Sequence, residues 1–162
     1  MKYLKYFKES ISVYQIRKNK PNILIILKSY FETALWTNND NEDFDDKNII
    51  DISDEAMNQA KTEIEWFVNN AGSSLNRISD TDIGHDIWLT RNHHGTGFWD
   101  RSFEDDDKEI LMELSDQLGE SDIYVGDDGE IYSSGSENYK KFDVEKWKEE
   151  LKLKKDVRKY NL

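Results

Sequence analysis

Residues 53–72 constrain the fold of this chain more than any other segment, because they carry a complete set of helix signals. Ser53 is a good N-cap residue, acidic residues follow it where the helix dipole favours anions, and Gly72 stands just past the expected end. Between these signals, apolar residues recur along one helical face: Ala60, Ile64, Phe67 and Ala71. We therefore predict a helix over residues 54–71. At about 1.5 Å per residue it spans roughly 27 Å, the width of a small domain.

Three further helices are predicted along the chain. Pro21 suits the first turn of a helix, and apolar residues follow it at steps of three and four as far as Trp36. Residues 107–118 show the same spacing and end before Gly119. Asp143 can cap a last helix, whose C-terminal end is basic, as the helix dipole favours.

Two β-hairpins are predicted in the second half of the chain. Residues 86–90 have strand composition, and residues 98–101 are expected to return as their partner strand after a turn at 92–97. Residues 122–132 contain an Asp-Gly turn signal and form the second hairpin. The predicted fold class is therefore α+β, with three to four helices packed on a small antiparallel sheet made by the two hairpins.

The chain is expected to form one domain with an added segment at each end. Its 162 residues match one domain of roughly 100–200 residues. We place an N-terminal arm at 1–20, which fits either a helix or a short strand, the α+β core at 21–132, and a linker with a basic C-terminal helix at 133–162. The predicted core consists of Ile26, Leu27, Tyr30, Ala34, Ile64, Phe67, Trp88, Phe98, Leu111, Leu114, Ile123 and Val125.

Composition excludes several classes of protein. The chain has no cysteine, which excludes a disulfide scaffold, cysteine catalysis and cysteine-ligated metal. The longest apolar stretch, residues 23–27, is far shorter than the ~20 residues of a membrane span, and the N-terminus has no signal-peptide pattern. We therefore expect a soluble protein of the cytoplasm that makes no membrane contact.

Charge is distributed unevenly along the chain. Residues 37–134 carry a net charge of −20, whereas residues 1–36 carry +5 and residues 135–162 carry +3. The repulsion within the acidic body would be relieved if the basic ends folded back over it. The acidic surface is either simply solvated, or it is a face that competes for the nucleic-acid-binding groove of a partner protein. In the second case the acidic clusters should share one face, with the contact surface formed by Asp43, Asp45, Asp46, Asp105, Asp106, Asp127 and Asp128.

Residues 84–101 (GHDIWLTRNHHGTGFWDR) contain all three histidines of the chain. Imidazole and carboxylate groups could bind a divalent ion, but the histidine spacing matches no known zinc pattern, and neither a metal nor a cofactor is predicted. In a hydrolytic site His94 would act as general base and Arg91 or Arg101 would stabilise an oxyanion or phosphate. No nucleophile elbow or phosphate-binding loop accompanies these residues.

The same segment also fits a structural role. Asp86 can bond to Arg91 or Arg101, and the aromatic residues of the segment, Trp99 among them, can fill the core. A binding pocket or a partner-contact surface remains the other interpretation. Its expected members are His85, Asp86, Arg91, His94, Trp99, Asp100 and Arg101.

Residues 84–101, together with residues 119–132 (GESDIYVGDDGEIY), resemble a family of small uncharacterised proteins encoded by tailed bacteriophages and related mobile elements. The resemblance covers roughly residues 30–132. Members of that family usually carry Gly at position 93, so His93 inherits no family role, and they carry Phe at Ile87 and Ala at Thr96. The seven expected binding residues named above all match the family pattern.

The phage resemblance, the small size, the lack of catalytic motifs and the acidic body together predict a phage-type accessory protein. We expect it to act in the host cytoplasm, where it binds and inhibits or redirects a host protein or ribonucleoprotein complex. Host defence machinery, such as a CRISPR effector or a restriction enzyme, is the expected class of target. One alternative is a small ligand-binding or hydrolytic enzyme centred on residues 85–101. Another is a phage RNA- or DNA-binding protein that uses its basic termini, including the basic C-terminal helix.

Overall fold

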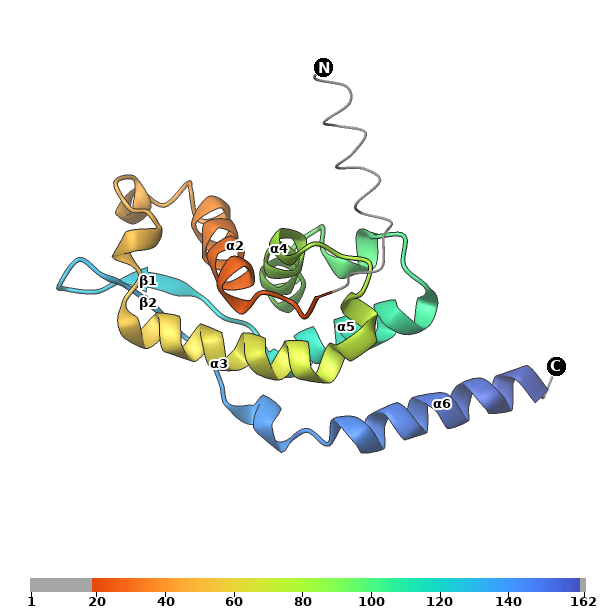
Figure 1. Cartoon of the computed structure of the whole chain (residues 1–162). Coiled ribbons are helices and arrows are strands. Elements are labelled where there is room, and N and C mark those ends of the chain that lie inside the picture. Colours follow the sequence, from red (N-terminus) through yellow and green to blue (C-terminus); the bar gives the residue numbers. More distant parts are fainter. Residues whose placement is uncertain (1–18, 161–162) are drawn as a thin grey trace, which may run out of the picture.

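The computed structural model describes residues 19–160, and Figure 1 shows their arrangement. The predicted N-terminal arm therefore lies almost wholly outside the described residues. Within them the chain forms five α-helices and one two-stranded antiparallel hairpin. In chain order these are α2 (Ile23–Thr37), α3 (Asp54–Ala71), α4 (Asp80–Arg91), α5 (Asp105–Leu118), β1 (Ile123–Val125), β2 (Ile131–Ser133) and α6 (Val144–Tyr160). None of these helices is long and apolar enough to cross a membrane.

Helix α3 has the bounds predicted for it. The Ser53 side chain accepts a hydrogen bond from the Ala56 N–H at 3.1 Å, and Gly72 ends the helix with a positive φ of 52°. The buried face contains the predicted apolar residues and also Glu63. It packs against α2 and α5, and in Figure 1 it lies between α2 and α6.

Helix α4 corrects the predicted hairpin at residues 86–101. The predicted strand 86–90 lies within this helix, and the predicted return strand is a 3₁₀ turn, η4 (Phe98–Asp100). Ser79 caps the helix by accepting a hydrogen bond from the Asp82 N–H at 3.1 Å. The fold is therefore mostly helical with one hairpin, and the prediction of two hairpins is wrong.

Burial on several sides explains why residues 86–90 of α4 have the sequence pattern of a strand. Its residues from Asp86 to Arg91 are all buried, because α2 covers one side and α5 another. This stretch has no exposed face, so its sequence shows no 3.6-residue period. The alternation of Ile87, Trp88 and Leu89 then resembles a strand by chance.

Helices α2 and α4 cross at Gly84. A Cβ atom at this position would lie 2.2 Å from the Ile26 carbonyl oxygen, so only glycine permits the contact. The Ser29 hydroxyl also donates to the Thr81 carbonyl across the same crossing. These contacts hold the two helices side by side, as Figure 1 shows.

The hairpin of β1 and β2 confirms the prediction for residues 122–132. Tyr124 pairs with Tyr132, and Gly129 has the positive φ of 82° that the turn requires. A bridge between Ile52 and Ile131 ties the hairpin to the start of α3, where the Ser53 N–H donates to the Ile131 carbonyl at 2.8 Å.

The predicted core is nearly complete. Eleven of its twelve members are buried, and Val125 is partly buried against them. Trp99 is the exception among the aromatic residues expected inside, because its side chain is 44% exposed on η4.

Helix α6 lies beside α3 and α5 and contacts them through long side chains (Figure 1). Asp143 caps it, as predicted, by accepting from the Lys146 N–H at 3.0 Å. The Lys155 ammonium contacts Asp106 and lies 2.9 Å from the Glu109 carboxylate, and Lys148 donates to the Asn70 carbonyl at 2.6 Å. This basic helix therefore folds back on the acidic body, as the charge distribution suggested.

Candidate functional site

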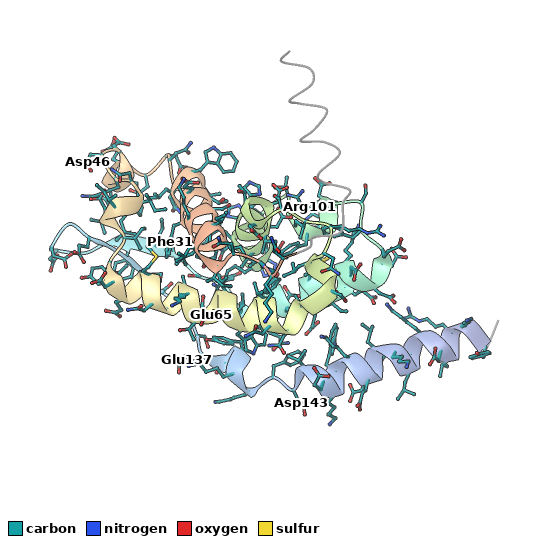
Figure 2. All side chains as sticks on the ribbon, in the orientation of Figure 1. Phe31, Asp46, Glu65, Arg101, Glu137 and Asp143 are labelled. Atoms are coloured by element: carbon teal, nitrogen blue, oxygen red, sulfur yellow. The ribbon has the colours of Figure 1, made fainter. Side chains whose placement is uncertain are left out.

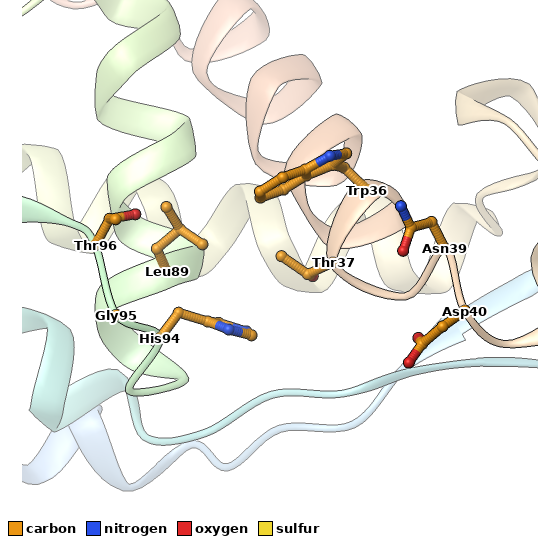
Figure 3. A pocket seen from close by; sticks show the side chains of 8 residues that line it. All are labelled: Trp36, Thr37, Asn39, Asp40, Leu89, His94, Gly95 and Thr96. Atoms are coloured by element: carbon orange, nitrogen blue, oxygen red, sulfur yellow. The ribbon is translucent and has the colours of Figure 1, made fainter.

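Two hollows lie along the exposed seam between α2 and α4, one on each side of Trp36. The first, with a volume of about 330 Å³, is named the Arg101 hollow. It is lined by Ser29, Glu32, Thr33, Trp36, Thr81, Asp82, His85 and Arg101. The second, of about 390 Å³, is named the His94 hollow. Figure 3 shows the residues that line it, which are Trp36, Thr37, Asn39, Asp40, Leu89, His94, Gly95 and Thr96.

The Arg101 hollow is built on a buried carboxylate. Asp86 is 2% exposed, and it accepts hydrogen bonds from Arg101 Nε and, at 3.1 Å, from Arg101 Nη2. Arg101 also lies 3.3 Å from an oxygen of Asp82. Burial alone would lower the pKa of the Arg101 guanidinium, but its hydrogen bonds and ion pairs with Asp86 and Asp82 outweigh burial and raise the pKa. Of the two partners predicted for Asp86, Arg91 and Arg101, the structure shows Arg101, and this ion pair holds η4 against α4.

His85 is bound to the same carboxylate. Its Nδ1 lies 3.2 Å from Asp86 Oδ1, and because a carboxylate only accepts, Nδ1 donates in this hydrogen bond. His85 also lines the hollow. A histidine oriented by a buried aspartate is an arrangement that can position a proton or a hydrogen-bonded ligand.

His94 lies in the other hollow and does not meet His85. It follows the end of α4, where its backbone N–H donates to the Leu89 carbonyl at 3.0 Å. In Figure 3 its imidazole points toward Asp40 across the hollow. Asp100 lines neither hollow and is exposed on η4. The expected cluster of His85, His94 and Asp100 is therefore not assembled.

Arg91 lines neither hollow, because it is completely buried in the core. It donates to Glu63 Oε2 at 2.6 Å, to the Tyr30 hydroxyl at 2.8 Å, and to the Leu118 and Gly119 carbonyls at 3.1 and 2.7 Å. Burial would lower the pKa of Arg91, but Tyr30 and Glu63 outweigh it and raise the pKa. The guanidinium joins α2, α3, α4 and the end of α5.

Sequence reasoning missed Glu63 as the partner of Arg91. The signal was present, since Glu63 interrupts the apolar face of α3 between Ala60 and Ile64. A carboxylate on a buried helix face requires a cation or several hydrogen-bond donors.

The predicted acidic clusters are divided between two ends of the molecule. Residues 40–55 and 127–130, named the acidic end, lie together, because a Cβ atom at Gly129 would be 3.8 Å from Lys47 Nζ. They carry eleven carboxylates and one lysine, and Figure 2 places Asp46 among them. Asp105 and Asp106 begin α5 toward the opposite end in Figure 1, where Lys155 contacts Asp106. Two of the three clusters therefore lie near each other, whereas Asp105 and Asp106 lie apart from them.

The acidic end also exposes apolar side chains. Ile50 is 84% exposed between the acidic residues of the loop. Tyr124, on β1, is exposed and stacks on Tyr132, with ring centroids 5.9 Å apart. The Tyr132 hydroxyl donates to Asp128 at 2.6 Å, which raises the pKa of Tyr132 to about 12.

No family model matches this chain, and no curated protein or solved structure matches it either. Within residues 19–160, the histidine and carboxylate side chains do not gather into a group of three or more that could hold a metal ion. The site is therefore interpreted from its own geometry.

Proposed function

We propose that this chain is a phage-type accessory protein that binds a basic surface of a host macromolecule through its acidic end. The observation that carries the proposal is the concentration of eleven carboxylates and one lysine at this end. Two of the three acidic clusters expected to form a contact surface meet there. The resemblance of residues 84–101 to a family of phage proteins supports the same role in the host cytoplasm.

Charged and apolar side chains contribute differently to such an interface. A dense field of one sign speeds association with an oppositely charged partner, and its effect falls with ionic strength. Exposed apolar side chains at the centre of a contact slow dissociation. Ile50, within the acidic end, and Tyr124, on the adjoining strand β1, are exposed and suited to this second role.

The expected class of partner is a host protein whose natural ligand is a nucleic acid, such as a restriction enzyme or a CRISPR effector. The groove of such a protein is lined with Lys and Arg that neutralise phosphates. A row of carboxylates can occupy the same groove. Binding by the acidic end would then exclude the nucleic acid.

Catalysis is less well supported, because His85 and His94 lie in different hollows and Arg91 is buried. Nucleic-acid binding through α6 is also less well supported. Lys155, one of its five basic residues beyond position 151, is already engaged by Asp106 and Glu109.

The proposal is tested with two variants of equal charge. Asp43, Asp45, Asp46 and Asp127 are changed to asparagine in the first variant. The second changes four exposed carboxylates elsewhere, as Asp116→Asn, Glu145→Gln, Glu149→Gln and Glu150→Gln. Each protein is immobilised and incubated with host lysate across a salt series, and duplex DNA is then added as competitor.

We expect a nucleic-acid-binding protein to be retained by the original chain and by the second variant, and to be released by DNA. Retention by the first variant should be weaker, most clearly at low salt. Equal retention by all three proteins, or complexes that DNA leaves intact, would contradict the proposal. As a functional test, expression of the chain should raise the plating efficiency of a phage restricted by the captured system.

A further inference from the structure

We propose that Trp36 and the two hollows beside it receive basic side chains of the partner, with one arginine or lysine on each side of the indole. The inference rests on the proposed function, since it names the residues that the acidic protein would recognise. It concerns a different surface, the seam between α2 and α4.

Trp36 is the first observation. Its side chain is 62% exposed in the last turn of α2, although other aromatic residues nearby, such as Tyr30 and Trp88, are buried. An indole is the best aromatic partner for a cation that lies over its face. Trp36 lines both hollows, and each is large enough for a side chain.

Charge is the second observation. Glu32 and Asp82 line the Arg101 hollow, and Asp40 lines the His94 hollow. Among the described residues that line the hollows, the only arginine or lysine is Arg101, and its guanidinium is engaged by Asp86 and Asp82. Within the described part of the chain, each hollow is therefore lined by at least one carboxylate and by no arginine or lysine that is free of an ion pair.

The Glu32 carboxylate is available to a partner. Glu32 has one ion pair, at 3.4 Å with Lys28 on the same helix, and both side chains are more than half exposed. Such surface pairs contribute little to stability. A guanidinium that pairs with Glu32 while covering the indole would combine an ion pair with a cation–π contact, an arrangement that suits arginine better than lysine.

Continuity with the acidic end is the third observation. Asp40 belongs to the acidic end and also lines the His94 hollow (Figure 3). A basic segment bound at the acidic end could therefore continue along α2 and reach Trp36. Trp36 would then be the aromatic anchor of the interface.

The probe is a fluorescein-labelled hexa-arginine peptide, and the control peptide has citrulline, the uncharged isostere, at each position. Binding is measured by fluorescence anisotropy at physiological salt. Trp36→Ala is compared with Tyr160→Ala, because Tyr160 is a strongly exposed aromatic residue at the end of α6 and lines neither hollow. Glu32→Gln is compared with Glu149→Gln, a carboxylate on the exposed side of α6.

We expect Trp36→Ala to weaken hexa-arginine binding roughly fivefold or more, as loss of a cation–π contact implies. Glu32→Gln should also weaken it, and both control variants should stay within twofold of the original chain. The citrulline peptide should not bind. Thermal melting of Trp36→Ala should match the original chain, because the side chain is exposed.

Three outcomes would overturn the inference. If hexa-arginine binds Trp36→Ala as tightly as the original chain, while the variant neutralised at Asp43, Asp45, Asp46 and Asp127 has lost affinity, the proposed function stands and the inference fails. If none of these variants loses affinity, both fail. Tighter binding of single-stranded oligo-dT than of the peptide, lost in Trp36→Ala, would assign the indole to base stacking instead.

Discussion

The ion pair of Arg91 and Glu63 should be the most sensitive point of the fold. Arg91→Met keeps much of the apolar length of the side chain and removes the guanidinium. Glu63 then loses its 2.6 Å partner, the Tyr30 hydroxyl loses its donor, and two carbonyl groups at the end of α5 lose theirs. Breaking a buried pair in this way costs about 3–5 kcal/mol, a large share of the roughly 5–15 kcal/mol that stabilise a domain.

The assay is urea unfolding followed by far-ultraviolet circular dichroism at constant pH. We expect Arg91→Met to lower the free energy of unfolding by about 3–5 kcal/mol, and the double variant with Glu63→Met to recover most of that loss, since apolar replacement of a whole buried pair is close to neutral. A loss below about 1 kcal/mol in the single variant would refute the reasoning. So would a double variant no more stable than the single one, because the cost would then not come from the unpaired carboxylate.

Three further predictions concern single positions. Gly84→Ala should lower the free energy of unfolding by about 1–3 kcal/mol or more. Gly95→Ala, with open space around it, should leave the free energy of unfolding unchanged. Equal melting temperatures of these two variants would contradict the close crossing of α2 and α4. Trp99→Ala should lower the free energy of unfolding by less than the roughly 3–5 kcal/mol expected for a core tryptophan, because its side chain is 44% exposed. A loss of about 3–5 kcal/mol in chemical unfolding would contradict this. The phenolate absorbance of Tyr132 should appear near pH 12 because Asp128 accepts from its hydroxyl. The folded protein holds this proton more tightly than the unfolded chain, so the stabilisation is present below pH 10.0 and is lost as the pH rises toward 12. Asp128→Asn should return the transition toward the ordinary value, and an unchanged titration would count against the bond.

Helix α3 and the β1–β2 hairpin could be predicted because their signals are local. Ser53 and Gly72 mark the ends of the helix, and the Asp-Gly turn marks the hairpin, without reference to the rest of the fold. Helix α4 could not be recognised by periodicity, since its neighbours bury it on several sides. Its cap was the one local signal: Ser79 stands three residues before Asp82, the spacing at which a cap hydroxyl accepts the N–H of the third helical residue.

The candidate site was predicted only in part, for a related reason. His85, Asp86 and Arg101 do meet, but residues 84–101 form a helix and a returning turn, which place His94 in a second hollow. Trp36, which separates the two hollows, was interpreted only as a helix residue. Its exposure depends on which face of α2 the rest of the fold covers, and the sequence of α2 alone does not report this.

The long separation of the groups that Arg91 joins has a consequence for folding kinetics. Its bonds to Glu63 and Tyr30 connect positions 28 and 61 residues apart in the chain. Contacts this distant form only after the intervening loops have closed, so they are expected to be absent from the transition state. An interaction that forms late leaves the rate of folding almost unchanged and instead retards unfolding. Arg91 should therefore determine how long a molecule persists in its native state once folded, rather than how quickly it reaches that state.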